Sequence, residues 1–183
     1  DQQHKIEVIN SMLSEEAGLN AALETAGVQP VETDLGEYIL QISDNEPPSH
    51  IIAPAMHKTK EEVAELFERV HKKPRKTDID EMTREAREIL RPKFLTADMG
   101  VSGANFLIAE TGSTLIVTNE GNGRLCTTLP RLHVAITGIE KVVATLEDAT
   151  TLLRLLPRSA TGQAITNYVS PHTGPKRLEE TDG

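Results

Sequence analysis

Short apolar runs separated by longer amphipathic segments make up most of the chain, and this pattern predicts strands that alternate with helices. Apolar runs this short, bounded by turn residues, suit strands better than helices. Such strands are predicted at residues 5–9, 28–31, 50–53, 106–109, 115–117, 132–137 and 164–169.

Helices are predicted where apolar residues recur at intervals of three and four. One begins at Thr59, because Glu62 three residues later completes a capping box. Another begins at Thr145, with Asp148 in its first turn, and is predicted to end at Pro157. Further helices are predicted from Ser11 or Ser14 to Gly27, over 35–42 and over 78–90. The side chains expected to face the core include Leu19, Ala22, Val70, Ile79, Leu146 and Leu152.

Strands that alternate with helices indicate an α/β fold with an open, mostly parallel sheet flanked by helices. A local β-hairpin is predicted where two apolar runs flank the turn from Glu110 to Ser113. The domain is predicted to cover residues 1–169, without its native N-terminus. Residues 170–183 are polar and contain two prolines and two glycines, which predicts a linker.

The segment after the hairpin is the strongest candidate for a functional site. Residues 118–124, TNEGNGR, contain no apolar side chain. Gly121 and Gly123 permit positive φ and let backbone N–H groups approach a ligand, and open α/β sheets bind ligands beyond the carboxyl ends of their strands. We therefore predict a ligand-binding loop made of Asn119, Glu120, Gly121, Asn122, Gly123 and Arg124.

The chemistry of this loop favours a small anionic ligand. The guanidinium of Arg124 can bond a carboxylate or phosphate bidentately. The alternative is an ordinary glycine turn in which Arg124 pairs with an acidic side chain. The loop lacks both the GxGxxG and the GxxxxGK[ST] spacing, so neither nucleotide-binding motif is indicated.

The hairpin turn is a second candidate, formed by Glu110, Thr111 and Gly112. A carboxylate at the end of a strand can act as a nucleophile or a base where it faces a pocket. The alternative is a turn residue that accepts hydrogen bonds from backbone N–H groups. His133 lies between Leu132 and Val134, and we interpret it as a hydrogen-bonded core histidine, not as a ligand.

Composition excludes several classes of function. A net charge of −9 and an aromatic content of 3% argue against nucleic-acid binding, which depends on clustered Lys and Arg and on stacking side chains. The basic run at 71–76 is interpreted as a solvated linker. No apolar run approaches the roughly 20 residues of a membrane span. The single Cys126 excludes a disulfide framework and a four-cysteine metal or iron–sulfur site within these residues, and it predicts a cytoplasmic protein.

Several long motifs resemble one known family. They are FLTADMGVSGANFLIAETGSTLIVTNEGNGRLCTTLPRLHVAITGIEKVV at 94–143, ETDLGEYILQI at 32–42, PPSHIIAPAMHKTKEEVAELF at 47–67 and RSATGQAITNYVS at 158–170. Together they resemble the lactate-utilization (LUD) domain family over nearly the whole chain. Residues 7–10, EVIN, depart from the family pattern, which has a more basic, serine-containing turn there.

The resemblance implies a fold related to the NagB/RpiA/CoA-transferase group. It also implies an iron–sulfur electron-transfer subunit of a multi-protein system that oxidises L-lactate to pyruvate, with other lactate-utilization subunits as partners. The [4Fe–4S] clusters would lie in a C-terminal ferredoxin-like region, so residues 1–183 alone are expected to hold no cofactor and to be non-catalytic. As an alternative, Glu110-Thr111-Gly112 resembles the glutamate–glycine spacing of CoA-transferases and would make this an acyl-CoA-transferase-like or small-molecule-binding enzyme domain.

Overall fold

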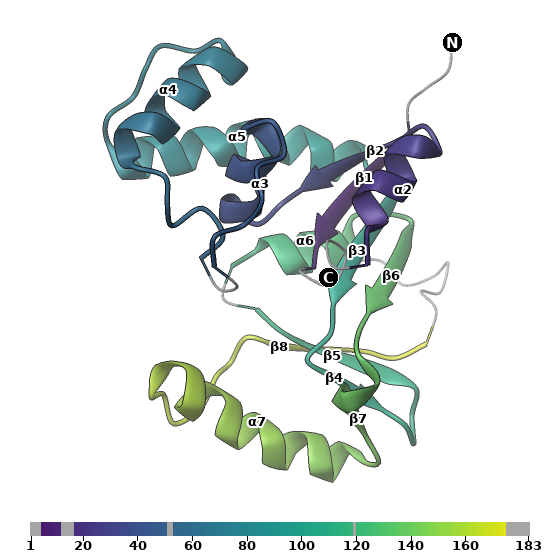
Figure 1. Cartoon of the computed structure of the whole chain (residues 1–183). Helices are drawn as coiled ribbons and strands as arrows, with labels where there is room; N and C mark the ends of the chain where they lie inside the picture. Colours follow the sequence, from purple (N-terminus) through teal and green to yellow (C-terminus); the bar gives the residue numbers. More distant parts are fainter. Residues whose placement is uncertain (1–4, 12–16, 51–52, 119, 175–183) are drawn as a thin grey trace.

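The computed structural model describes residues 5–11, 17–50, 53–118 and 120–174. These residues form two four-stranded sheets, which we call sheet A and sheet B. Figure 1 shows sheet A with its helices in the upper half of the molecule and sheet B with one long helix in the lower half. The predicted α/β fold with an open, mostly parallel sheet is confirmed.

Sheet A is entirely parallel. Val8 lies opposite Gly100 on the neighbouring strand, and Gly100 lies opposite His133 on the next. The spatial order of its strands is β2 (Val28–Glu32), β1 (Lys5–Asn10), β3 (Met99–Gly103) and β6 (Leu132–Ile136).

The main hydrophobic core lies between sheet A and the helices that cover it. Val8 and Val31 from the sheet, both buried, pack with Leu66, Phe94 and Cys126 from the helices. These helices are α3 (Leu35–Ile42), α4 (Lys60–His71), α5 (Ile79–Thr96) and α6 (Asn122–Thr128).

Sheet B is inserted in the chain between β3 and α6, and is completed by later segments. Its spatial order is β7 (Val142–Val143), β4 (Phe106–Ile108), β5 (Ser113–Val117) and β8 (Val169–His172). The strands β4 and β5 are antiparallel neighbours, which confirms the predicted hairpin. A short 3-10 helix, η1 (Ile139–Lys141), leads from β6 into β7.

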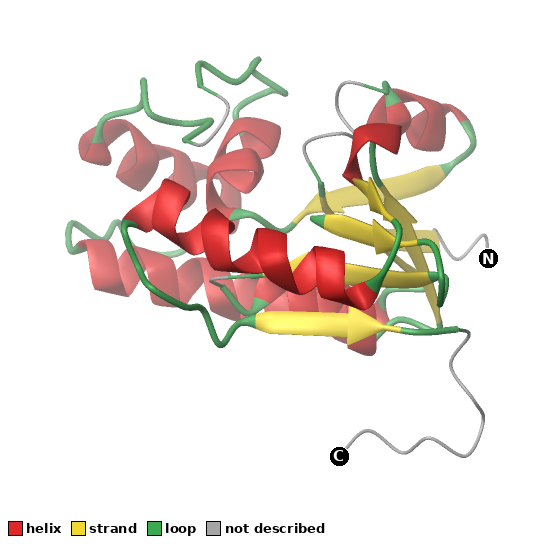
Figure 2. Ribbon diagram, turned by 90° about the horizontal axis from the view of Figure 1, so that it is seen from below, coloured by secondary structure: helices red, strands yellow, loops and turns green. Residues whose placement is uncertain are grey.

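A second hydrophobic cluster joins sheet B to helix α7 (Leu146–Thr161). Ala149 of α7 is fully buried against Ile108 and Leu115 of the hairpin, and Leu153 packs beside them. Figure 2 shows α7 lying across the lower side of the molecule next to β8. Each sheet therefore has a hydrophobic cluster of its own.

The predicted helix starts are confirmed where capping residues defined them. Thr59 and Glu62 form a reciprocal capping box at the start of α4, and Thr145 forms another with Asp148 at the start of α7. Each box satisfies backbone N–H groups that the first helical turn leaves without a partner.

Two helix ends were predicted wrongly, because both helices continue through a proline. Helix α5 runs past Pro92 to Thr96, and α7 runs past Pro157 to Thr161. In α5 the buried Phe94 anchors the segment beyond the proline, and in α7 Pro157 is itself buried. Tertiary packing of these residues outweighs the backbone hydrogen bond that each proline removes.

Some strand predictions were also wrong. His50 and Ala53 are not in a strand, and residues 51–52 lie outside the described part. The strand predicted at 164–169 lies later, as β8, so residues 170–172 of the predicted linker pair with β5. Residues 132–136 do form β6, but the sequence pattern predicted a buried strand, whereas β6 lies at the edge of sheet A with Leu132 and Val134 exposed.

The first helix is described only in part, because residues 12–16 lie outside the described residues. Its described portion, α2 (Leu19–Thr25), buries none of its side chains, contrary to the predicted core-facing pattern. Gly27 follows it with φ of 77°, a conformation that favours glycine and agrees with the predicted helix stop. Further side chains predicted to face the core are exposed, namely Val70, Ile79, Leu146 and Leu152.

Candidate functional site

The carboxyl end of sheet A is the place where open α/β sheets bind ligands. After β1 the chain moves to β2 on one side, whereas β3 lies on the other side of β1. The ends of β1 and β3 approach each other closely, since a Cβ on Gly103 would stand 3.6 Å from Ser11 Oγ. Because β2 and β3 lie on opposite sides of β1, the strand order reverses between β1 and β3. Ser11 and Gly103 mark this point.

The loop predicted from the sequence reaches this end of sheet A. Asn122 Nδ2 donates a hydrogen bond of 3.3 Å to the backbone oxygen of Thr33, which directly follows β2. The loop thus lies near the carboxyl end of sheet A, but the route differs from the one we expected, and its role in binding stays a prediction. The strand that leads into the loop is β5, which belongs to sheet B and not to the parallel sheet.

The conformation of the loop also differs from the prediction. Residues 122–124 form the first turn of α6 and are not irregular, while Asn119 lies outside the described residues. Gly121 has φ of −77°, and Gly123 is buried and is not among the glycines with positive φ. The glycines are thus not needed for positive φ.

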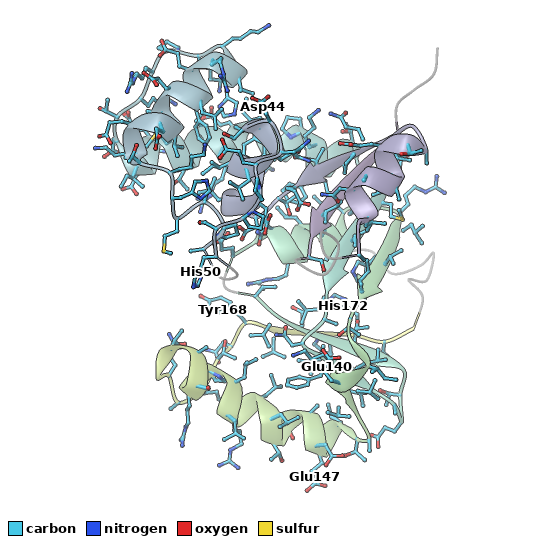
Figure 3. All side chains as sticks on the ribbon, viewed as in Figure 1. Asp44, His50, Glu140, Glu147, Tyr168 and His172 are labelled. Carbon is cyan, nitrogen blue, oxygen red and sulfur yellow. The ribbon has the colours of Figure 1, made fainter. Side chains whose placement is uncertain are left out.

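Arg124 is exposed on α6, and its guanidinium carbon lies 5.5 Å from the centre of the Tyr168 ring. This geometry is a cation–π contact. Within the described part of the chain Arg124 forms no ion pair with a carboxylate. The alternative interpretation, Arg124 paired with an acidic side chain, therefore finds no support among the described residues. Figure 3 shows Tyr168 near one end of β8, between the two halves of the molecule.

Glu120 brings negative charge to the same place. Burial raises the pKa of its carboxyl, the nearby Asp34 carboxylate raises it further, and Arg87 opposes the shift. Asp34 Oδ1 caps α3 by accepting a 3.0 Å hydrogen bond from the backbone N–H of Gly36. The carboxylates of Glu120 and Asp34 and the guanidinium of Arg87 therefore influence one another here.

The hairpin turn lies at the other end of β5. Glu110, Thr111 and Gly112 are exposed, and five strand residues separate them from Thr118, a span of roughly 16 Å. The Glu110 backbone N–H donates to the backbone oxygen of Ala144, and Gly112 has φ of 66°. The structure does not bring the two groups of predicted site residues together. A catalytic role for Glu110 stays a prediction.

Comparison with known proteins identifies the family. The model of the LUD domain matches residues 2–182. The chain belongs to the LUD domain family. Lactate utilization protein B from Geobacillus kaustophilus (strain HTA426) is 49% identical over 182 residues, covering 100% of this chain and 38% of the relative. Lactate utilization protein B from Bacillus subtilis (strain 168) is 49% identical over 179 residues, covering 98% of this chain and 37% of the relative. The protein of the same name from Bacillus pumilus (strain SAFR-032) is 51% identical over 179 residues, covering 98% of this chain and 38% of the relative.

This LUD domain thus spans under two fifths of the length of the curated relatives that it matches. No solved structure matches the chain. Among the described residues, none of the helices has the length and apolar character needed to cross a bilayer.

Two histidines of the LUD domain meet between the sheets. His133 on β6 and His172 on β8 have ring centres 5.8 Å apart, and His133 Nε2 lies 2.8 Å from the hydroxyl of the buried Ser102. His133 is therefore hydrogen-bonded, as interpreted from the sequence. His172 was not predicted as a site residue, because it lies in the segment predicted to be a linker. Figure 3 labels it near the end of β8.

The two histidines are expected to make the LUD domain less stable in acid. Burial lowers the pKa of both imidazoles from 6.5, and for His133 the neighbouring His172 lowers it further. Below pH 6.5 the two imidazoles bind protons in the unfolded chain but not yet in the folded domain. The free energy of unfolding therefore falls with decreasing pH until the pH is below the pKa values of the folded domain. Urea unfolding at about pH 7.5 and about pH 5.5 tests this. The double variant His133→Gln, His172→Gln should lose less stability than the wild type, and an equal loss would contradict the prediction.

A buried polar network joins α3, α4 and α5, three of the helices that cover sheet A. His71 Nδ1 lies 2.7 Å from Glu85 Oε1, and Lys76 Nζ lies 3.0 Å from Glu85 Oε2. The hydroxyl of Tyr38 lies 2.8 Å from His71 Nε2. The sequence interpretation of 71–76 as a solvated linker missed this network, because Glu85 is distant in sequence and lies on α5.

A second polar cluster holds the segment between α3 and α4. Glu46 accepts hydrogen bonds from Lys58 Nζ at 2.7 Å and from Ser43 Oγ at 3.2 Å, and it lies 3.2 Å from His57 Nε2. The hydrogen bonds from Lys58 and His57 lower the pKa of Glu46 to about 2. Glu46 is therefore ionised at neutral pH, and it fixes this segment.

Proposed function

We propose that this LUD domain is part of a cytoplasmic lactate utilization protein that takes part in the oxidation of L-lactate to pyruvate. The observation that carries the proposal is the 49% identity with lactate utilization protein B along the whole chain. In this role the domain docks partner subunits and supports electron transfer through [4Fe–4S] clusters. Those clusters lie in the part of the full-length protein outside residues 1–183.

The environment of Cys126 supports placing the clusters elsewhere. A [4Fe–4S] cluster is held by four cysteine thiolates, and this chain has one cysteine. Cys126 is fully buried, its sulfur lies 3.6 Å from the hydroxyl of Thr33, and burial raises the pKa of its thiol to about 12. Such a thiol is poorly suited to metal binding, which requires the thiolate.

Growth on lactate tests the proposed function. A strain lacking the gene for the full-length protein should fail to grow with L-lactate as carbon source and should grow normally on pyruvate. Reintroducing the full-length gene should restore growth on L-lactate. Unchanged growth and unchanged L-lactate oxidation in the strain without the gene would contradict the proposal.

The location of the clusters can be measured directly. Anaerobic reconstitution with iron and sulfide should give the full-length protein the visible absorption of a [4Fe–4S] cluster. The same treatment of residues 1–183 should give none, because one buried cysteine cannot supply four thiolate ligands. A [4Fe–4S] absorption band from residues 1–183 would overturn this part of the proposal.

The proposal includes a small anionic ligand at the carboxyl end of sheet A, bound by Arg124. Its supporting observation is an exposed guanidinium whose described contact is an aromatic ring. Arg124→Ala should weaken binding of such an anion by about 1.5–3 kcal/mol, the scale of a charge-assisted hydrogen bond, with little change in melting temperature. Calorimetric titration with L-lactate, pyruvate and phosphate tests this, with Arg131→Ala as a control for general charge. Unchanged binding to Arg124→Ala would rule out this role.

A further inference from the structure

The two edges of sheet A differ in their protection against pairing with another strand. At one edge, β2 contains Pro30, which has no N–H to offer, and α2 packs against β2. At the other edge, β6 has the sequence LHVAI, with neither a proline nor a charged residue. Exposed edge strands usually carry such protection, because their free N–H and C=O groups attract other strands. The composition of β6 is typical of a strand with neighbours on both sides.

The side chains along this edge are also unusually apolar for a surface. Leu132 and Val134 of β6 are 55% and 38% exposed. The chain continues from β6 through η1, where Ile139 is 89% exposed, to β7 at the edge of sheet B, where Val142 is 41% exposed. We call these four residues the β6–β7 edge. Figure 1 shows β6 at the outer side of sheet A, with η1 and β7 below it.

We propose that β6 pairs with a further β-strand that comes from the part of the full-length protein outside residues 1–183. About three fifths of each relative lies outside the region that this chain matches. The described chain also passes close to this edge near its last residues, because His172 contacts His133 of β6. A strand in the same polypeptide pairs at high effective concentration and needs no separate partner.

The chemistry of the edge favours a strand over other occupants. Parallel sheets are normally covered on both faces, and their interior strands are continuous apolar runs. A partner strand would satisfy the outward-facing backbone groups of β6 by hydrogen bonds. Its side chains would cover Leu132 and Val134. Because β6 contains no Asp, Glu, Lys or Arg, a partner that binds through charged side chains would find no ion-pair partner within this strand.

Hydrogen exchange of backbone amides in the full-length protein tests the pairing. If β6 has a strand on both sides, all amides of 132–136 should exchange at rates similar to those of the interior strand β1. They should exchange about 100-fold more slowly than amides of the same sequence in an unstructured peptide. Outward-facing amides of β6 that exchange at the rate of the unstructured peptide, while those facing β3 are protected, would overturn the proposal. So would protection that disappears on dilution, because it would assign the edge to a second copy of the protein.

A pair of variants in the full-length protein provides an independent measurement. Leu132→Glu places a charge on the β6–β7 edge, and Ile165→Glu places one at a comparably exposed apolar position, 73% exposed, before β8. A covering strand would make Leu132→Glu lower the melting temperature by about 5 °C, while Ile165→Glu should lower it by less than about 1 °C. Equally small effects of both variants would contradict a covered edge.

Discussion

Replacing Gly100 by alanine is expected to lower the free energy of unfolding by about 3 kcal/mol, the upper range for overpacking a core. A Cβ at this position would overlap the backbone oxygen of Cys126, and it would stand 2.9 Å from the carbonyl carbon and 3.1 Å from Pro130 Cγ. The obstacle is largely backbone, so no side-chain rotation relieves it. Helix α6 would have to move away from β3.

The sign of the change in unfolding free energy distinguishes two effects of the alanine side chain, its steric clash with α6 and its higher propensity for a strand. Alanine is favoured over glycine in a strand by about 0.5–1 kcal/mol, so propensity alone predicts that Gly100→Ala stabilises the domain. Chemical denaturation measures the difference, with Gly121→Ala as the control because a Cβ there meets nothing within 4 Å. The control should stay within about 0.5 kcal/mol of the wild type. A wild-type stability for Gly100→Ala would contradict the close packing of α6 on β3.

Glu85→Gln is expected to cost about 2–3 kcal/mol of stability. The side chains of Glu85 and His71 are each 2% exposed, and removing the buried carboxylate charge weakens the hydrogen bonds that Glu85 accepts from His71 and Lys76. Lys76, the second partner of Glu85, is 31% exposed and can regain water, so we expect a smaller loss than the roughly 3–5 kcal/mol of a fully buried pair. Urea denaturation measures the loss.

The effect of Glu85→Gln should also depend on pH. Burial raises the pKa of the Glu85 carboxyl, but hydrogen bonds from His71 and Lys76 and the charges of these residues outweigh it, so the pKa is lowered from 4.5. The stabilisation is therefore present above pH 4.5 and is lost as the pH falls further. The difference between wild type and variant should shrink in acid. Glu88→Gln, which removes an exposed pair with Lys73, is the matched control and should leave the free energy of unfolding unchanged. A similar result for both variants would contradict the importance of burial.

Local chemistry made much of the fold predictable from sequence. Thr59 and Thr145 marked two helix starts because the hydrogen bonds of a capping box close within four residues. The hairpin around Gly112 was predictable because its turn is also a local feature. The turn needs positive φ at one position, and glycine supplies it. Pro157 was wrongly predicted to end its helix, because its burial depends on the tertiary fold and leaves no local pattern.

The candidate site was predictable only in part. The contact of Asn122 with Thr33 brings the loop near the carboxyl end of sheet A, but the prediction wrongly assumed that β5 belonged to that sheet. Sheet membership depends on pairings such as β5 with β8, which join residues far apart in the chain and leave no local pattern. The contacts of Arg124 with Tyr168 and of His133 with His172 depend on the same long-range arrangement.

The interleaving of the two sheets has a consequence for folding during synthesis. All four strands of sheet A precede residue 137 in the chain, so they emerge from the ribosome before Val169–His172, the neighbour that β5 of sheet B still lacks. Sheet A and its helices can therefore fold while the hairpin still has an unpaired side. During that interval the open side of β5 is exposed to association with other nascent chains. A slow stretch of translation between α7 and β8 would lengthen this vulnerable period without changing a single contact of the finished domain.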